Sequence, residues 1–214
     1  MDTILWIGLT GCAGHEPLKV GGLEPLEDNT AAFPGDDDPE GISIVSGGNS
    51  DLWWAHGRGY VDAPFDAVWA AARDPEVGVD RREVDEWVVS DVPSPTLDAS
   101  YQVHCLVNDV ITVEYDLWWR HDLSSPDDTS GLALDDEATA DRLVALWDKT
   151  EGTVFIDLLA GSLVLYPTED GRTAVELIEH LKAPLRDDLT LVAYLEDFHA
   201  TLVAASHGEA LPVW

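Results

Sequence analysis

Large and small residues alternate from Leu52 to Asp62, which reads LWWAHGRGYVD. A period of two is typical of a strand with one buried face. The next apolar residues recur at helical spacing, and they are Phe65, Val68, Trp69 and Ala72. Asp62 offers an N-cap carboxylate, Pro64 suits a first helical turn, and Asp74 with the following proline ends the pattern. The stretch therefore predicts a strand followed directly by a short helix.

Three further alternating segments follow, at residues 83–92, 100–108 and 110–121, and turn residues separate them. They predict consecutive antiparallel strands. Residues 135–147 carry their apolar side chains at helical spacing and predict a helix, with Ala138, Leu143, Leu146 and Trp147 on one side.

The C-terminal part begins with an apolar run at residues 152–167, which predicts one long or bent strand. A turn at residues 169–172 joins it to a strand over residues 173–182. Residues 187–207 predict the longest helix, which carries Leu191, Leu195, Phe198 and Leu202 in one apolar stripe. The order predicts an α+β fold, in which a curved antiparallel sheet wraps around a long C-terminal helix.

The first fifty residues have a different character. Leu9-Thr10-Gly11-Cys12 ends an apolar run and resembles the bacterial lipoprotein box. The resemblance implies that residues 1–12 are a signal and that Cys12 becomes a lipid-modified N-terminus. Ala13 in the next position implies an outer-membrane destination facing the periplasm. The alternative is an ordinary N-terminal strand in an unprocessed, cytoplasmic protein.

Residues 13–50 are rich in Pro, Gly and acidic side chains, and we interpret them as a flexible linker. Within them, residues 41–46 alternate enough to form a short edge strand. The expected organisation is therefore a signal at 1–12, a linker at 13–50 and one folded domain at 51–214, which is long enough to bury a core.

Charge excludes one class of partner. The 42 acidic residues outnumber the 11 basic ones and give a formal net charge of −31. Nucleic-acid binding draws its affinity from clustered Lys and Arg, so we expect no nucleic-acid partner. The two cysteines, Cys12 and Cys105, are not expected to pair, because Cys12 has the role above and Cys105 suits a small buried apolar position.

The folded part also resembles a known superfamily. A strand followed by APFDAVW and DP, with GSLVLYP and DGRTAVE near the end, is similar to the START-like, SRPBCC, helix-grip superfamily, which includes polyketide cyclases. The resemblance covers residues 51–208. It implies a cavity between the sheet and the long helix, where lipids or other apolar molecules bind, and it calls for no cofactor or metal.

The strand periods place candidate side chains in that interior. The expected ligand-binding residues are Tyr101, Tyr115, Trp119, Glu179, Phe198 and His199. The first reading is a membrane-tethered protein that binds a hydrophobic or lipid-like molecule. The second is a cyclase-like or hydrolytic enzyme that uses Glu179 and His199, and the third is a ligand-free module with a filled core. His104, His121 and His180 are expected to point mostly outward.

Overall fold

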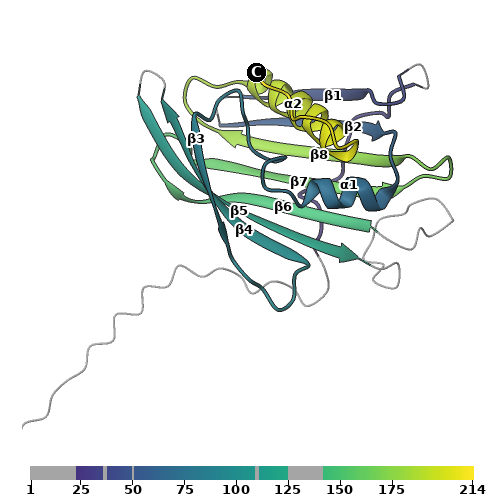
Figure 1. The fold of residues 1–214 in the computed structure, drawn as a ribbon. Coiled ribbons are helices and arrows are strands. Elements are labelled where there is room, and N and C mark those ends of the chain that lie inside the picture. The colour runs from purple at the N-terminus through teal and green to yellow at the C-terminus, as the bar shows by residue number, and fades with distance from the viewer. Residues whose placement is uncertain (1–22, 36–37, 50, 109–110, 125–141) are drawn as a thin grey trace, which may run out of the picture.

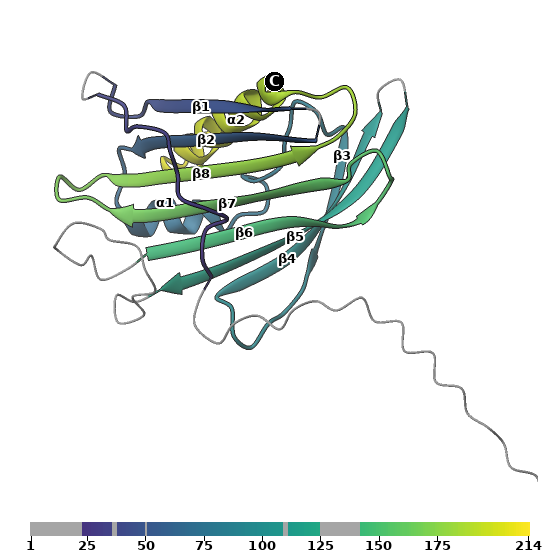
Figure 2. The same ribbon diagram turned by 180° about the vertical axis from the view of Figure 1, so that it is seen from behind.

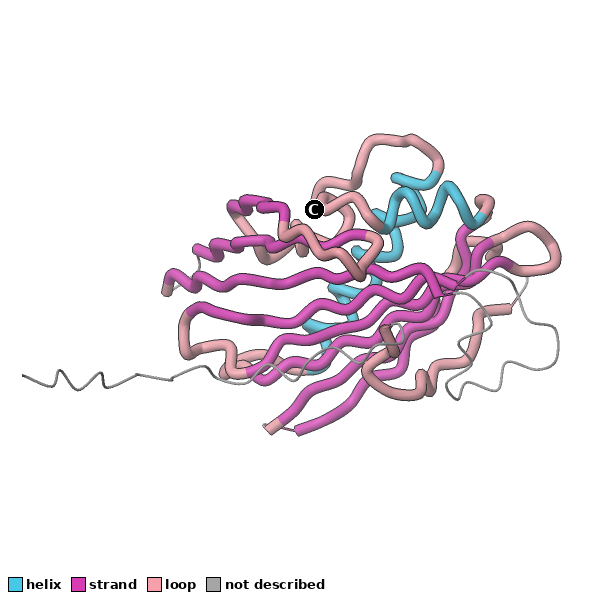
Figure 3. The backbone as a smooth tube through the Cα atoms, turned by 90° about the horizontal axis from the view of Figure 1, so that it is seen from below, coloured by secondary structure: helices cyan, strands magenta, loops and turns pink. Residues whose placement is uncertain are grey.

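A computed structural model describes residues 23–35, 38–49, 51–108, 111–124 and 142–214. In these residues eight antiparallel strands form one curved sheet in the order β1-β2-β8-β7-β6-β5-β4-β3 (Figures 1 and 3). The strands are β1 (Ile42–Asn49), β2 (Leu52–Val61), β3 (Glu86–Asp91), β4 (Ala99–Asn108), β5 (Thr112–Ser124), β6 (Arg142–Gly152), β7 (Leu158–Pro167) and β8 (Thr173–Lys182).

Two helices lie on the concave face of the sheet: α1 (Phe65–Ala72) and α2 (Asp188–Ser206). Both are in front of the strands in Figure 1 and behind them in Figure 2. The core fills the space between α2 and the sheet, and its members include Leu177, Leu195 and Leu202, each 0% exposed. The α+β helix-grip architecture expected from the sequence is confirmed.

The C-terminal elements match their sequence patterns closely. Strand β8 covers residues 173–182, and α2 begins one residue after Asp187. The side chain of Asp187 caps α2 by accepting hydrogen bonds from the backbone N–H groups of Leu189 and Thr190.

The N-cap of α1 differs from the expectation. Pro64 occupies the N-cap position of α1 without a side-chain hydrogen bond, so Asp62 does not cap it.

The helix predicted over residues 135–147 is wrong where the structure can test it. Residues 142–147 belong to strand β6, and residues 135–141 lie outside the described residues. Leu143, Ala145 and Trp147 face α2, while Val144 is buried on the opposite face. A strand buried on both faces reads as a continuous apolar run, which periodicity alone does not separate from a buried helix.

The folded domain starts earlier than residue 51. Strand β1 pairs with β2 along its whole length, which realises the edge strand that residues 41–46 indicated. Residues 23–35 cross the convex face of the sheet in an extended path (Figure 2). Asn29 anchors them by donating its side-chain amide to the carbonyls of Gly57 and Leu177, at 3.0 Å each. The flexible linker expected over 13–50 is therefore wrong for this part, because its polar side chains bind the sheet.

The proposed signal and Cys12 lie outside the described residues, as does the linker up to residue 22. Within the part of the chain that the structure describes, neither helix is long and apolar enough to cross a membrane.

Candidate ligand-binding cavity

A cavity of about 300 Å³ lies between the concave face and the N-terminal half of α2. This volume is at the lower end of the range for small-molecule sites, roughly 300–1,000 Å³. Its walls come from β4, β5, β6, β7 and β8, from α2, and from the loops at the end of the sheet where α2 begins. The apolar lining is formed by Val103, Val107, Val113, Leu117, Ile156, Leu159, Leu181 and Leu191.

Aromatic rings form the deep end of the cavity. Trp119 of β5 and Trp147 of β6 stack with their ring centroids 4.4 Å apart, and each is 1% exposed. Phe198 of α2 stacks against both rings from the helix side, at 6.1 and 5.9 Å. These packed rings give the cavity a rigid floor, because none of them has room to rotate into a new position.

Glu179 is placed on this floor by the register of three strands. Gly161 of β7 pairs with Trp147 on one side and with Glu179 of β8 on the other. A Cβ atom at Gly161 would lie well inside 3.0 Å of both neighbouring side chains. Since glycine leaves this space free, the indole of Trp147 and the carboxyl of Glu179 close over its backbone.

Burial favours the neutral form of the Glu179 carboxyl. The residue is 1% exposed, and its burial raises its pKa well above the ordinary value of 4.5. The negative charge of Asp80 raises the pKa further, while a hydrogen bond with Trp147 acts in the opposite direction. Oε2 of Glu179 has no hydrogen-bond partner among the described atoms. The cavity thus contains a buried carboxyl with unused hydrogen-bonding capacity.

Asp80 supplies the second acidic group of the cavity lining. Burial raises its pKa to about 6, although its carboxylate accepts hydrogen bonds from the backbone N–H groups of Glu83 and Arg82. At neutral pH this carboxylate is charged. One side of the cavity is therefore negative, whereas burial favours the neutral carboxyl of Glu179 at the floor.

Three further polar groups of the lining, Tyr194, Tyr115 and Cys105, are uncharged and hydrogen-bonded. Tyr194 of α2 donates its hydroxyl to the carbonyl of Gly78 at 3.1 Å. Tyr115 and Cys105 hydrogen-bond across β4 and β5, and burial raises the pKa of the Cys105 thiol to about 12. A thiol with such a pKa carries no thiolate at neutral pH, so Cys105 is not a nucleophile.

The mouth of the cavity opens at the end of the sheet where α2 begins. Arg186 in the loop before α2 donates to Glu83 at 2.6 Å, so an ion pair joins two loops that line the mouth. Ile111, Phe155 and Leu185 also line it, and each is an exposed apolar side chain.

Three of the six residues expected to bind ligand line the cavity: Tyr115, Trp119 and Glu179. Tyr101 is buried beyond the floor, where its ring stacks with Trp119 and His121. Phe198 supports the floor from the helix side and does not line the cavity.

His199 faces away from Glu179. Its Nε2 lies 3.1 Å from the carbonyl oxygen of Tyr60, and its ring packs over Gly59 of β2. Burial lowers the pKa of His199, so the imidazole is neutral. The structure therefore does not assemble the acid-base pair that the sequence suggested.

His121 was expected to point outward, yet it is 0% exposed. It lies two residues after Trp119 on β5, so its side chain faces the same interior side of the sheet. Several cavity residues were not predicted from the sequence, and they include Asp80, Arg186 and Trp147. Asp80 lies in a stretch without periodicity, Arg186 follows the last strand, and Trp147 falls in the segment read as a helix. The sequence contains one sign of this arrangement. Gly161 lies opposite Glu179 across the last hairpin, and a glycine there leaves room for large neighbouring side chains.

No family model matches the chain, and none of the curated proteins does. Solved structures do resemble it. Human StAR-related lipid transfer protein 5 aligns with a TM-score of 0.47 and 12% identity, over 80% of this chain and 89% of that one. The Zhui aromatase/cyclase from a Streptomyces species aligns with a TM-score of 0.45 and 15% identity, over 73% of this chain and 92% of that one. Proteins of both kinds fit the START-like, helix-grip superfamily, and this chain is similar to them in fold.

Proposed function

We propose that the protein binds an apolar small molecule that carries one uncharged hydroxyl or carbonyl group, with that group placed at Glu179. The observation that carries the proposal is the carboxyl of Glu179, which lines an apolar cavity, is 1% exposed and has an Oε2 without a hydrogen-bond partner among the described atoms. A buried polar group without a partner costs about 1–3 kcal/mol. A ligand that supplies the missing hydrogen bond recovers part of this cost, so the site favours molecules with such a group.

The charge of the cavity selects against anions. A neutral carboxyl both donates and accepts a hydrogen bond, which suits an alcohol or a ketone. An ionised ligand such as a fatty-acid anion would approach the charged carboxylate of Asp80 in a medium of low dielectric constant. The net charge of −31 acts in the same direction at longer range.

Binding is better supported than catalysis. The enzyme hypothesis relied on Glu179 and His199 acting together, but His199 is engaged with Tyr60. The third hypothesis, a module with a filled core, does not agree with a cavity of about 300 Å³.

The proposal is tested with three rigid probes of nearly equal shape: naphthalene, naphthol and naphthoate. We measure their dissociation constants by equilibrium dialysis against the full chain carrying Cys12→Ala. Naphthol is expected to bind about 5-fold more tightly than naphthalene, from about 1 kcal/mol for one hydrogen bond, and naphthoate is expected to bind most weakly. Equal affinity for all three would contradict the role of Glu179.

Two variants locate the interaction. Glu179→Gln keeps a neutral hydrogen-bonding group and is expected to keep the preference for naphthol, whereas Glu179→Leu is expected to abolish it. Val113→Trp fills the cavity near its mouth and is expected to block all three probes. Val88→Trp is the matched control, because Val88 is 61% exposed on β3 and does not line the cavity. Binding that survives Val113→Trp would place the probes elsewhere.

We also propose that the protein is tethered to the bacterial envelope through a lipid on Cys12, with the outer membrane facing the periplasm as the destination. The sequence LTGC and the apolar run before it support this. A thioether-linked diacylglycerol together with an amide-linked chain anchors a protein stably, at about 0.8 kcal/mol per buried CH₂. Cys12→Ala is expected to move the protein from the membrane fraction to the soluble fraction. A membrane fraction unchanged by the substitution would refute the anchor.

A further inference from the structure

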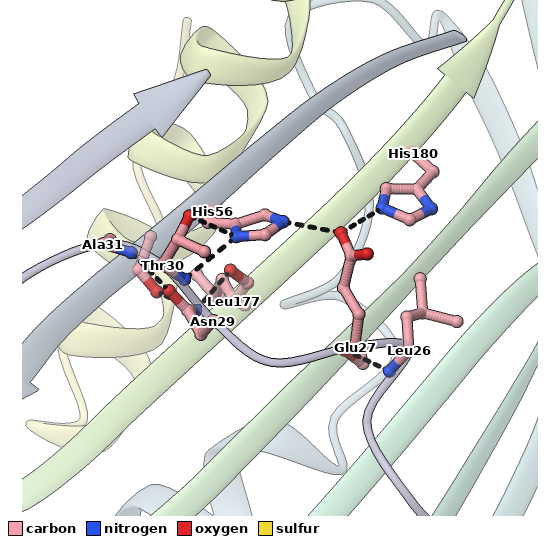
Figure 4. Close-up of polar contacts among 10 residues, drawn as sticks. Leu26, Glu27, Asn29, Thr30, Ala31, His56, Leu177 and His180 are labelled. Atoms are coloured by element: carbon pink, nitrogen blue, oxygen red, sulfur yellow. Dashed lines mark hydrogen bonds and ion pairs between the residues drawn. The ribbon is translucent and has the colours of Figure 1, made fainter. Parts of the chain in front are cut away.

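Three side chains from distant parts of the chain meet on the convex face, on the opposite side of the sheet from the cavity. They are Glu27 from the segment before β1, His56 of β2 and His180 of β8 (Figure 4). Oε1 of Glu27 lies 2.8 Å from Nε2 of His56 and 2.9 Å from Nε2 of His180. The three potential ligand atoms all lie within 4.8 Å of one another.

The two imidazoles are held by the sheet. His56 pairs with Ile178 across β2 and β8, and His180 lies two residues further along β8. A two-residue offset keeps both side chains on the same face of the sheet. His56 is 4% exposed, because residues 23–35 cover it. Their relative position is thus set by strand register before any ligand binds.

Glu27 is held less tightly than the two histidines. The backbone N–H of Leu26 donates to Oγ of Ser162 at 3.2 Å, and Asn29 is anchored to the sheet two residues after Glu27. The side chain of Glu27 is 46% exposed, so it has room to move. The group therefore combines two fixed nitrogen atoms with one adjustable oxygen atom.

Two imidazole nitrogens and one carboxylate oxygen form a donor set that suits Zn²⁺ and other divalent first-row transition metals. Mg²⁺ and Ca²⁺ prefer oxygen atoms alone. We propose that Glu27, His56 and His180 bind a zinc-like divalent ion, with water completing the coordination, and that the ion fastens residues 23–35 to the convex face of the sheet.

The second nitrogen of His56 faces Thr30. Nδ1 lies 3.0 Å from the backbone nitrogen of Thr30 and 2.9 Å from its Oγ1. Without metal, the N–H of Thr30 donates to Nδ1, so the ring proton is on Nε2 and is donated to Glu27. When Nε2 binds the ion, the proton moves to Nδ1, where Oγ1 of Thr30 can accept it, and the backbone N–H of Thr30 has to turn away from the ring. Metal binding therefore includes a small shift of the N-terminal segment at Thr30.

Coordination requires a modest adjustment. Bonds from Zn²⁺ to nitrogen and oxygen are about 2.0–2.2 Å, so ligand atoms around a tetrahedral ion stand further apart than hydrogen-bonded atoms do. Glu27 Oε1 must therefore withdraw from both Nε2 atoms, and the two imidazole rings, whose Nε2 atoms lie within 4.8 Å of one another, must turn toward the ion. The half-exposed side chain of Glu27 on the N-terminal segment allows its withdrawal without disturbing β2 or β8.

The test is a titration of the full chain carrying Cys12→Ala with Zn²⁺, followed by calorimetry, and with Co²⁺, followed by its visible absorption. We expect one Zn²⁺ per chain, a tetrahedral Co²⁺ spectrum, and slower proteolysis within residues 23–35 when metal is present. Mg²⁺ should have no effect. No uptake of Zn²⁺, or binding without protection of residues 23–35, would overturn the proposal and leave the group as a hydrogen-bonded contact only.

Single substitutions separate this site from adventitious binding. Glu27→Gln and His180→Gln retain hydrogen-bonding groups on partly exposed side chains, and each is expected to weaken Zn²⁺ binding at least about 10-fold. The matched control is His104→Gln, because the half-exposed side chain of His104 on β4 pairs with Asp116 of β5, away from the site. Equal losses in the control and the site variants would refute the proposal.

Thr30 is tested as a positioning residue. Thr30→Val removes Oγ1 and is expected to weaken Zn²⁺ binding about 10-fold or more, and Thr30→Ser is expected to restore it. If Thr30→Val bound Zn²⁺ as tightly as the parent, Oγ1 of Thr30 would not be the acceptor of the His56 ring proton. These titrations do not involve the cavity, so their outcome is independent of the naphthol experiment.

Discussion

Replacement of Gly161 by alanine tests how the cavity floor is built. Gly161 lies between Trp147 and Glu179 in the register of β6, β7 and β8. A new Cβ atom there would lie well inside 3.0 Å of the Trp147 ring and of Glu179 Oε2, whereas ordinary contacts begin at 3.4 Å. Trp147 cannot yield easily, because it is 1% exposed and stacks on Trp119 at 4.4 Å.

The magnitude follows from two opposing effects. Overpacking of a close-packed core costs about 1–3 kcal/mol, and the fixed rings at Gly161 favour the upper end of this range. A Gly to Ala change stabilises by about 0.4–1 kcal/mol through the unfolded chain. We therefore expect Gly161→Ala to lower the free energy of unfolding by about 2 kcal/mol, and to lower Tm by roughly 4–8 °C for a domain of this size.

The measurement is thermal and urea unfolding, followed by circular dichroism and tryptophan fluorescence. Gly35→Ala is the matched control, because no heavy atom lies within 4 Å of a Cβ atom built at Gly35. It is expected to change stability by no more than about 0.5 kcal/mol. If Gly161→Ala were as stable as the control, the close contact of Trp147 and Glu179 over this glycine would be refuted.

Two further predictions concern charged groups near the cavity. The folded-state pKa of Asp80 is raised from 3.8 to about 6, so its stabilising contribution is present below pH 3.8 and is lost as the pH rises through 6. As the pH rises from 4 to 7, Asp80→Asn should therefore become more stable relative to the parent, by at most about 3 kcal/mol at 1.36 kcal/mol per pKa unit. Urea unfolding at both pH values measures this, and an unchanged difference in unfolding free energy between variant and parent would contradict it. Arg82 donates to both oxygens of buried Asp197 at 2.8 Å, so Arg82→Ala should lower Tm in differential scanning fluorimetry, with partial recovery in the double variant that adds Asp197→Asn. A single variant as stable as the parent would refute that role.

Residue patterns were sufficient where boundary residues delimit an element. Strand β8 and helix α2 were predicted almost to the residue, because a turn at residues 169–172 precedes β8, Asp187 caps α2 and Gly208 follows its last turn. Periodicity failed for β6, since Val144 is buried on the convex face and hides the period of two. The cover over Val144 comes from beyond β6 itself, so the local sequence contains no sign of it.

The candidate site was predicted in part for a similar reason. Strand parity placed Tyr115, Trp119 and Glu179 on the interior face, and they line the cavity. Parity does not tell how far along the helix axis an interior side chain lies, and this is why Phe198 and His199 were included. The convex-face group was not predicted at all, because Glu27 and His180 are 153 residues apart in the chain.

The alternation of large and small residues along β2 also explains where the cavity lies. The small residues, Ala55, Gly57 and Gly59, are on the face of β2 that meets α2. A Cβ atom at Gly59 would lie 2.9 Å from Nε2 of His199, and one at Gly57 would lie 3.5 Å from Leu195.

The helix therefore approaches β2 as closely as backbone allows, at one side of the sheet. On the other side of the sheet, the larger side chains of Tyr115 and Trp119 in β5 line the cavity. We infer that the small residues of β2 bring α2 close to one side of the sheet, and that the cavity occupies the space left between the N-terminal half of α2 and the other side.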